Sequence, residues 1–483
     1  MRGALEKAGE ALGRVPAALL VVIGIGVLLR IAIAIAVSPT IMNNVDSLVY
    51  VGGAENGLFA DPVRPSGYSI FLQALHAISD QVSFTIFVQH LLGIATACLL
   101  YVTVRRVGTP IWAGVLAAAA ILLSLDQIYL EHTLLAETLF TFLLTGVFYC
   151  CVRALDAPRP LRGPIDTRIA WILGAALVLG ICAWVRTVGV TLAPFLALWF
   201  ALAIPGSWRA RLGRIALTGV AAGAVILGYF FAHEATNGYF GLTNGSGRVL
   251  LGRVSTFADC TKFEVPAGAE ALCEDTPSAE RPGSDFYIWD AGSPAWKEFG
   301  PVPAEDDLAR EFAKRAILAQ PVDYAQTVAS DTARHFVPFL NDERPSSGTP
   351  YDWMKIERRD LGEGDVFKFI DGYYDTGPLV VRGLAGPLSD LQDVLRVHQV
   401  LMLQALLLSI AGLWFSSGRV RAALALFIGT GVLLLLIPSV TATYNARYAV
   451  PLGGTFLAAT ALGIWVLLER YKARILADGP DPA

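Results

Sequence analysis

Charged residues are scarce in this chain. Asp, Glu, Lys and Arg make up 16% of its 483 residues, while hydrophobic residues make up 54% and the mean hydropathy is +0.54. A soluble domain ordinarily carries about 25% charged residues. The shortage of charge excludes an ordinary soluble protein and favours a chain that lies mostly in a lipid bilayer.

Familiar metal-binding patterns are also missing. The chain has six Cys and six His, but it contains no CxxC pair and no HExxH sequence, and the polar segments contain no DxD sequence. Zinc sites and helical metalloprotease sites depend on such spacings. We therefore expect neither a metal ion nor another cofactor.

Long apolar runs are what the chain has instead. Runs of about 16 to 22 residues can cross a bilayer core of about 30 Å as helices, and they are too continuous for barrel strands. The first run is longer than the 7–15 apolar residues typical of a signal peptide, so we expect an uncleaved first helix. The prediction is an all-α polytopic membrane protein with about ten spans: 15–37, 83–104, 110–125, 133–152, 169–185, 188–204, 215–231, 398–415, 422–440 and 448–468.

Basic residues follow every second span, which predicts the orientation. Loops rich in Lys and Arg stay on the cytoplasmic side. The basic groups are Arg105-Arg106, Arg153/Arg159/Arg162/Arg168, Arg209/Arg211/Arg214, Arg419/Arg421 and Arg470/Lys472/Arg474. This alternation predicts a multi-pass membrane protein with a cytoplasmic N-terminus.

The same alternation places 38–82 and 232–395 outside the cytoplasm. The second segment holds 27 of the 41 acidic residues but only 15 of the 37 Lys and Arg, a net charge of −12. An acidic outer face argues against nucleic acid as a partner, because that binding needs a basic surface. We expect an N-terminal membrane module of about seven spans (1–231), an extracytoplasmic domain (232–395) and a C-terminal module of about three spans (396–483).

Cys260 and Cys273 are the two cysteines of the predicted outer domain. A disulfide persists in an oxidising compartment, so these residues either form one bridge or remain two free thiols. We predict the bridge. The other four cysteines lie in apolar spans, where a thiol behaves as a small hydrophobic group.

Asp46 lies in the first predicted outer loop, just beyond a membrane span. Either it caps or solvates a short helix, or it is a general base that takes the proton of an acceptor hydroxyl. A single carboxylate within hydrogen-bond reach suffices for an inverting displacement if the donor brings its own leaving group. A glycosidase would instead need two carboxylates flanking the bond.

Arg64 precedes the turn sequence Pro65-Ser66-Gly67 in the same loop. Either it reaches toward lipid headgroups as an interfacial arginine, or it binds a phosphate. A guanidinium group pairs bidentately with phosphate oxygens and stabilises the charge of a leaving phosphate.

Further charged residues mark other helix ends on the same predicted side. Glu137 lies about one turn into a span, and Arg186 interrupts the apolar sequence between two spans. A carboxylate at this depth needs a partner, so the two residues either bind substrate or form a structural pair with each other. Arg447 and Tyr448 occupy the corresponding end of the last span.

Several short motifs resemble one enzyme superfamily. They are Asp46 with Tyr50, Arg64-Pro65-Ser66-Gly67-Tyr68, Ala136-Glu137-Thr138-Leu139-Phe140, Gln320-Pro321-Val322-Asp323-Tyr324 and Ala446-Arg447-Tyr448-Ala449-Val450-Pro451. Their order and sidedness resemble the GT-C membrane glycosyltransferases. The nearest branch contains the protein O-mannosyltransferases, lipid A aminoarabinose transferase and the RgtA-like bacterial enzymes.

The resemblance implies two juxtamembrane helices in the first outer loop and a cavity that faces outward. It places the catalytic carboxylate on Asp46 and the donor-phosphate contacts on Arg64 and Arg447. It implies substrate contacts for Tyr50, Tyr68, Glu137, Arg186 and Tyr448. Ser47 follows Asp46 where the O-mannosyltransferases carry adjacent Asp and Glu, and this difference argues against peptide mannosylation.

With this resemblance, the sequence predicts an extracytoplasmic inverting glycosyltransferase embedded among the lipids of a bacterial inner membrane. A polyprenyl-phosphate sugar would be the donor, and a hydroxyl of a lipid, polysaccharide or protein would be the acceptor. Two alternatives from other classes are a transporter or flippase of a lipid-linked glycan and a non-catalytic membrane assembly protein. Transporters usually carry polar residues near the middle of the bilayer and show internal repeats, whereas the informative charges here lie at helix ends.

Overall fold

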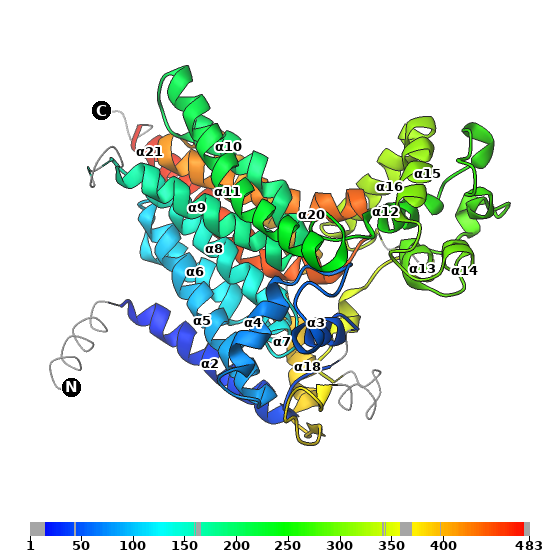
Figure 1. Ribbon diagram of the computed structural model, residues 1–483. Coiled ribbons are helices and arrows are strands. Elements are labelled where there is room, and N and C mark those ends of the chain that lie inside the picture. Colours follow the sequence, from blue (N-terminus) through cyan, green and yellow to red (C-terminus); the bar gives the residue numbers. More distant parts are fainter. Residues whose placement is uncertain are drawn as a thin grey trace.

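The structure is a computed structural model, and it describes residues 15–42, 45–158, 160, 166–340, 342, 344–357, 370–396 and 398–477. Long helices run side by side through most of the molecule, and shorter helices gather at one end of this bundle (Figure 1). These shorter helices, here called the α12–α16 unit, are α12 (Ser246–Ser255), α13 (Ser284–Trp289), α14 (Pro294–Phe299), α15 (Asp306–Ala319) and α16 (Pro321–Arg334). The end of the bundle that carries this unit is called the domain end.

Within the described residues, eight helices are long and apolar enough to cross a membrane, and a bent pair would make a ninth. The helices that contribute to them are α2 (Ala17–Ala36), α5 (Val82–Arg106), α8 (Glu137–Ala154), α9 (Thr167–Val185), α11 (Trp208–Asn237), α18 (Ala385–Val394) with α19 (Gln399–Phe415), α20 (Gly418–Thr441) and α21 (Gly453–Ala477). The prediction of an all-α polytopic membrane protein is confirmed.

Two of the ten predicted spans are not single long helices. The segment 110–125 forms α6 (Ile111–Leu122), which bends by 55° into α7 (Leu125–Glu131). The segment 188–204 forms a 3-10 turn, η1 (Thr187–Thr191), followed by the 12-residue helix α10 (Leu192–Ala203). At 1.5 Å per residue, α10 alone is about 18 Å long, which is short for a bilayer core.

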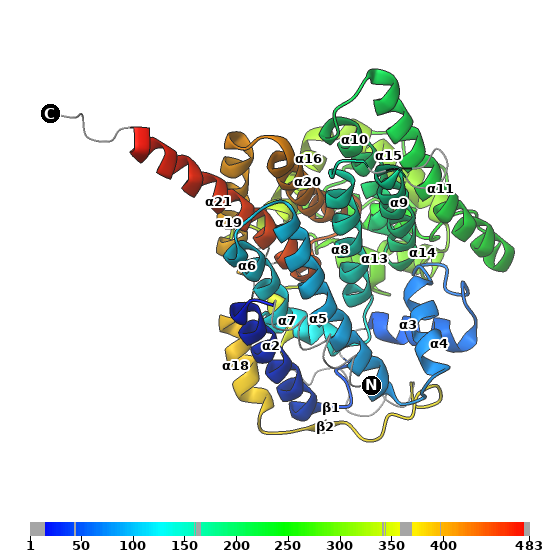
Figure 2. The same ribbon diagram turned by 90° about the vertical axis from the view of Figure 1, so that its left-hand side faces the viewer.

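Small residues let neighbouring helices approach closely. A Cβ atom on Gly412 of α19 would lie 2.3 Å from the Cα atom of Gly463 on α21, so the two backbones touch at this crossing. Membrane helices associate largely through such close packing, because lipid tails are as apolar as the side chains that they replace. The α19–α21 pair thus holds the C-terminal helices together, and α21 continues beyond its neighbours toward the C-terminus (Figure 2).

Opposite the domain end, one carboxylate gathers three arginines. Asp156 lies within 2.7 Å of both Arg106, at the end of α5, and Arg419, at the start of α20, and 3.2 Å from Arg153 in the last turn of α8. Three of the loops predicted to be cytoplasmic therefore lie at one end of the bundle. Arg159 and Arg162, which also entered the orientation prediction, lie outside the described residues.

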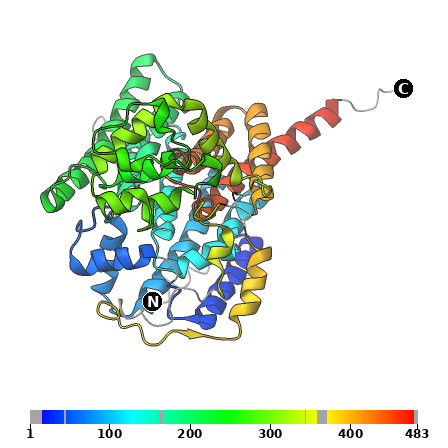
Figure 3. The ribbon, with the colours of Figure 1, turned by 90° about the vertical axis from the view of Figure 1, so that its right-hand side faces the viewer.

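Three elements from distant parts of the sequence meet at the domain end. The 38–82 segment forms the short helices α3 (Val45–Asn56) and α4 (Gly67–His76), and α18 packs beside α2 and α7. A two-stranded antiparallel pairing of β1 (Val37–Ser38) and β2 (Val380–Val381) joins these parts. Figure 3 shows the α12–α16 unit in front of the bundle, with α3 and α4 below it.

The α12–α16 unit has an apolar core of its own. Leu251 and Val254 of α12 pack with Phe312 and Ala316 of α15, and all four are buried. Helices α12 and α16 also contact α20, so this unit packs against the membrane bundle.

Candidate active site

Asp46 lies in the first turn of α3, where a carboxylate suits the positive end of the helix dipole. Its Oδ1 atom accepts hydrogen bonds from Nη2 (2.6 Å) and Nε (3.0 Å) of Arg64, and its Oδ2 atom accepts one from Nη2 of Arg447 (2.8 Å). Burial alone would raise the pKa of Asp46, but the charges and hydrogen bonds of Arg447 and Arg64 outweigh burial and hold that pKa well below its ordinary value. Asp46 is therefore ionised at any physiological pH.

The turn before α4 positions Arg64. The side-chain hydroxyl of Ser66 accepts a hydrogen bond from the Phe59 backbone N–H (2.9 Å), and the Ser66 N–H donates to the Tyr229 hydroxyl (2.9 Å). A Cβ atom on Gly67 would lie 2.4 Å from the carbonyl oxygen of Trp184, so only glycine fits here. This close approach holds the Arg64 turn against the end of α9.

Arg447 connects two carboxylates. It lies in the 3-10 turn η6 (Ala446–Tyr448), whose start is capped by the Asn445 side chain accepting from the Arg447 N–H (3.0 Å). Besides its contact with Asp46, its Nε atom lies 3.0 Å from Oε1 of Glu137. Arg447 is 8% exposed, and its Nη1 atom has no hydrogen-bond partner among the described residues.

Glu137 and Arg186 complete the chain of contacts. Glu137 is in the first turn of α8 and 1% exposed, and its Oε1 atom forms an ion pair with Nη1 of Arg186, directly after α9. The Arg186 guanidinium lies 5.3 Å from the centre of the Tyr448 ring. Arg64, Asp46, Arg447, Glu137 and Arg186, here called the arginine network, thus link four separate parts of the sequence.

The arginine network carries a surplus of positive charge. It contains three guanidinium groups and two carboxylates, which leaves one unit of positive charge in a largely buried place. A buried surplus charge is costly unless a counter-ion binds there. The unpaired Nη1 atom of Arg447 marks where an anion could accept a hydrogen bond.

The predicted tyrosines hold different positions. Tyr50 lies one helical turn after Asp46 on α3, and its ring meets the Tyr68 ring edge-on at 5.0 Å. The Tyr68 hydroxyl donates a 2.6 Å hydrogen bond to Oε1 of Gln89, which in turn donates to backbone carbonyls at Glu131 and Thr133. Tyr68 is fully buried and its hydroxyl is already hydrogen-bonded to Gln89. It therefore packs against Tyr50 of α3 and is not a member of the arginine network.

Two residues near the network were not singled out in the sequence, and both are on α13. The Arg64 guanidinium lies 4.9 Å from the centre of the Trp289 ring, a cation–π contact. Asp285, one turn earlier, interacts electrostatically with Arg447. The segment 238–300 shows no helical periodicity in the sequence, so no pattern pointed to a helix at this position.

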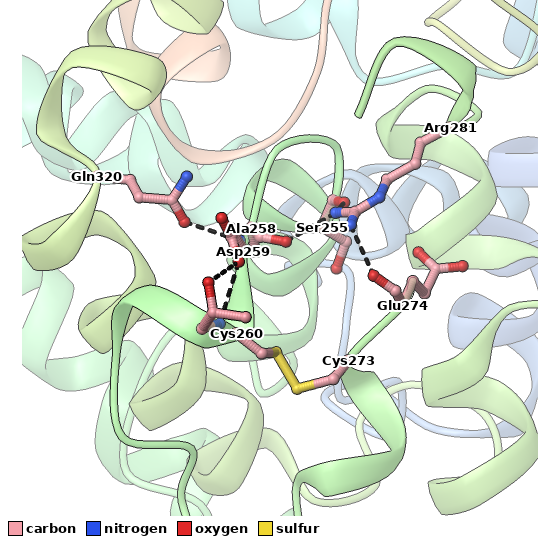
Figure 4. The surroundings of a disulfide bond; sticks show 9 residues. Ser255, Ala258, Asp259, Cys260, Cys273, Glu274, Arg281 and Gln320 are labelled. Atoms are coloured by element: carbon pink, nitrogen blue, oxygen red, sulfur yellow. Dashed lines mark hydrogen bonds between the residues drawn. A yellow bond between two sulfur atoms is a disulfide. The ribbon is translucent and has the colours of Figure 1, made fainter. Parts of the chain in front are cut away.

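Cys260 and Cys273 form a disulfide in the α12–α16 unit, with Cα atoms 5.9 Å apart (Figure 4). Nearby, the Arg281 guanidinium donates to the backbone carbonyls of Ser255 (3.0 Å), Ala258 (2.8 Å) and Glu274 (2.9 Å). The bridge and the arginine together fix an irregular segment that leads into α13. The disulfide is a structural element and makes no contact with the arginine network.

The described residues contain no group of three or more His, Cys, Asp or Glu arranged to hold a metal ion. Both carboxylates of the arginine network are already bound to guanidinium groups. The chemistry that the site can perform by itself is therefore binding of an anion and alignment of a hydroxyl group by a carboxylate.

No family model and no curated protein sequence matches the chain. Among solved structures, it aligns with the apo oligosaccharyltransferase of Archaeoglobus fulgidus at 14% identity and a TM-score of 0.46, over 97% of this chain and 52% of that one. It also aligns with the AglB oligosaccharyltransferase of the same organism in complex with an inhibitory peptide and a dolichol-phosphate, at 13% identity and a TM-score of 0.44, over 96% of this chain and 52% of that one.

A third alignment is with ArnT from Cupriavidus metallidurans bound to undecaprenyl phosphate, at 15% identity and a TM-score of 0.35, over 96% of this chain and 81% of that one. The chain spans about half the length of the archaeal chains that it matches. These alignments compare the fold alone.

Proposed function

We propose that the chain is an extracytoplasmic glycosyltransferase that moves a sugar from a polyprenyl phosphate to an acceptor hydroxyl. The observation that carries the proposal is the surplus positive charge of the arginine network, together with the unpaired Nη1 atom of Arg447. A polyprenyl-phosphate sugar is a phosphodiester with one negative charge, which equals the surplus. Binding of such a donor would neutralise the buried site.

The position of the network suits a lipid-linked donor. Glu137 begins one candidate membrane span, Arg186 directly follows another and Arg447 is the second residue of a third. The network therefore lies where the bundle meets the interface, so a bound phosphate could sit there while its polyprenyl tail stayed in the bilayer. With the predicted positive-inside orientation, this interface faces away from the cytoplasm.

The roles of the residues follow from their contacts. Arg447 and Arg64 would bind the donor phosphate and stabilise the charge that grows on it as the sugar–phosphate bond breaks. As the phosphate takes over guanidinium contacts, a carboxylate oxygen of Asp46 becomes free to accept the hydrogen bond of the acceptor hydroxyl. Glu137 and Arg186 would hold Arg447 in place, with Tyr448 and Tyr50 lining the sugar side of the site.

One observation favours a transporter instead. Within the bundle, Arg30 of α2 forms a bidentate ion pair with Glu131 (2.8 Å for both contacts), and His90 of α5 lies 3.1 Å from the same carboxylate. Ionisable residues inside a membrane often mark a transport pathway. Here, however, the carboxylate of Glu131 is fully buried and already paired, which suits a structural tie between α2 and α7 better than a pathway.

The decisive experiment is a donor panel. Purified protein would be incubated with undecaprenyl phosphate carrying labelled mannose, glucose or arabinose, together with lipid, polysaccharide or protein fractions as acceptors. An enzyme releases free undecaprenyl phosphate in an acceptor-dependent way, whereas a flippase moves the intact donor across a vesicle membrane.

The matched variants are Asp46→Asn and Asp390→Asn. Asp46→Asn should abolish transfer while the protein still inserts and binds donor, because it removes the carboxylate and keeps the side chain's shape. Asp390 is an exposed carboxylate on α18, so Asp390→Asn should transfer as fast as the wild type. Normal turnover by Asp46→Asn would refute the role given to Asp46.

A further inference from the structure

The turn η6, which carries one arginine of the network, is held by a segment from outside the membrane bundle. This segment, 345–349, follows α16 in the sequence and runs beside η6, where the Ala446 N–H donates to the Thr349 carbonyl (2.9 Å). Gly348 has a φ angle of +108°, and a Cβ atom there would overlap the Tyr444 carbonyl oxygen. Glycine therefore allows the two stretches of backbone to approach closely.

One side chain joins the 345–349 segment to Arg447. The Oδ1 atom of Asn445 accepts a hydrogen bond from the Arg447 N–H (3.0 Å), and its Nδ2 atom donates one to the Thr349 hydroxyl oxygen (3.2 Å). An amide group can do both at once, because it carries an acceptor oxygen and two donor hydrogens. The Thr349 hydroxyl thus fixes the amide that fixes the backbone at Arg447.

The same segment also holds α13 in place. The Gly283 N–H, directly before α13, donates to the Pro345 carbonyl (2.8 Å), and a Cβ atom on Gly283 would overlap the backbone of Ser347. At the other end of α13, the Trp289 ring lies against the Arg64 guanidinium. The 345–349 segment is therefore tied both to η6 and to the helix that contacts the second arginine of Asp46.

We propose that Asn445 and Thr349 are positioning residues for Arg447, and that through them the 345–349 segment sets the affinity for the phosphate of the donor. This role rests on the proposed function and deepens it, because it names what holds the phosphate-binding arginine in place. Both residues act through Arg447, and neither is a member of the arginine network. Guanidinium–phosphate hydrogen bonds depend on geometry, so a small shift of η6 lowers the affinity.

The test is calorimetric titration of the purified full-length protein with undecaprenyl phosphate. Thr349→Val keeps the shape of the side chain but removes the acceptor for Asn445, so we expect binding to weaken about 2- to 10-fold, the worth of one neutral hydrogen bond. Thr349→Ser keeps the hydroxyl and should bind as the wild type does. The matched control is Thr332→Val on α16, which removes a hydroxyl bonded to the Val328 carbonyl (2.8 Å) and should leave the affinity unchanged.

A double-mutant cycle shows whether Thr349 acts through Arg447. In the Arg447→Gln background, Thr349→Val should cause no further loss of affinity, because the group that it positions is gone. The role of Thr349 is overturned if Thr349→Val binds as tightly as the wild type, if Thr349→Ser binds as weakly as Thr349→Val, or if the losses of Thr349→Val and Arg447→Gln simply multiply. Failure of the wild type itself to bind undecaprenyl phosphate would instead overturn the proposed function, and the inference with it.

Discussion

Replacing Arg447 with glutamine tests how the arginine network is balanced. The change removes one positive charge, so that Arg64 and Arg186 face Asp46 and Glu137 with no surplus. It also breaks the contacts to Asp46 Oδ2 (2.8 Å) and Glu137 Oε1 (3.0 Å). Hydrogen bonds to charged groups contribute about 1.5–3 kcal/mol each, and glutamine can replace one of the two, so we expect a loss of about 1.5–3 kcal/mol of stability.

The same substitution should weaken binding of the donor. The lost Nη1 donor is worth about 1.5–3 kcal/mol in a charge-assisted bond to phosphate, which corresponds to about 10- to 100-fold in affinity. Calorimetric titration of purified protein with undecaprenyl phosphate measures this loss, and thermal unfolding in the same detergent measures the loss of stability.

A double variant measures the coupling between Arg447 and Glu137. Arg447→Gln and Glu137→Gln each remove the contact between Arg447 Nε and Glu137 Oε1, so adding the two single losses counts this contact twice. We expect the double variant to be more stable than that sum by about 1–3 kcal/mol. Arg310 is the matched control, since it also pairs with two carboxylates, Asp306 and Asp307, but lies outside the network.

Arg310→Gln should leave the affinity for undecaprenyl phosphate unchanged. If Arg447→Gln binds this lipid as tightly as the wild type does, the network is not the phosphate site. If the double variant is as unstable as the two single losses added together, Arg447 and Glu137 do not stabilise each other, and the contact between them contributes nothing to the network.

Three other predictions concern stability. Replacing Cys260 and Cys273 with alanine opens a loop with a sequence separation of 13 residues, and thermal unfolding with and without reductant should show a loss of about 3 kcal/mol for the α12–α16 unit. Glu131→Gln leaves the buried Arg30 without its carboxylate partner. The free energy of unfolding of this variant should fall by about 3–5 kcal/mol, which thermal unfolding measures as a lower unfolding temperature. Asp285→Asn should instead increase the stability. Folding raises the pKa of Asp285 from 3.8 to about 7, so the wild-type protein loses stability progressively as the pH rises from 3.8 to 7. The asparagine variant should therefore be more stable than the wild type by up to about 4 kcal/mol at pH 8, with no such gain below pH 4, and an equal gain at both pH values would contradict the shift.

The sequence was sufficient for the membrane class and for the members of the arginine network. Hydrophobic length reveals spans because a bilayer leaves few alternatives, and the alternation of basic loops groups Asp46, Glu137, Arg186 and Arg447 at one end of the bundle. It could not decide whether Glu137 pairs with Arg186 or serves the site. In the structure Oε1 of Glu137 contacts both Arg186 and Arg447, so the predicted pair with Arg186 is present, and the substrate contact stays a prediction.

The part of the site that the sequence did not predict lies in a segment without a recognisable helical periodicity. Helix α13 has six residues, too few to show a periodicity, and its place is set by tertiary contacts such as the Asp285–Ser346 backbone bond. The short helix α10 was predicted as a full span because its composition is apolar. Composition does not reveal that the chain first turns through η1, which uses up residues that a longer helix would need.

The ion pairs of Asp156 with three arginines connect parts of the chain that are far apart in the sequence. Arg106 and Arg153 come from the part of the chain before the long polar segment, and Arg419 comes from the part after it. At the opposite end, Arg447 joins the later part to Asp46 and Glu137 of the earlier one. Ion pairs thus join the two stretches of membrane helices at both ends of the bundle, in addition to the polypeptide segment that connects them in the sequence.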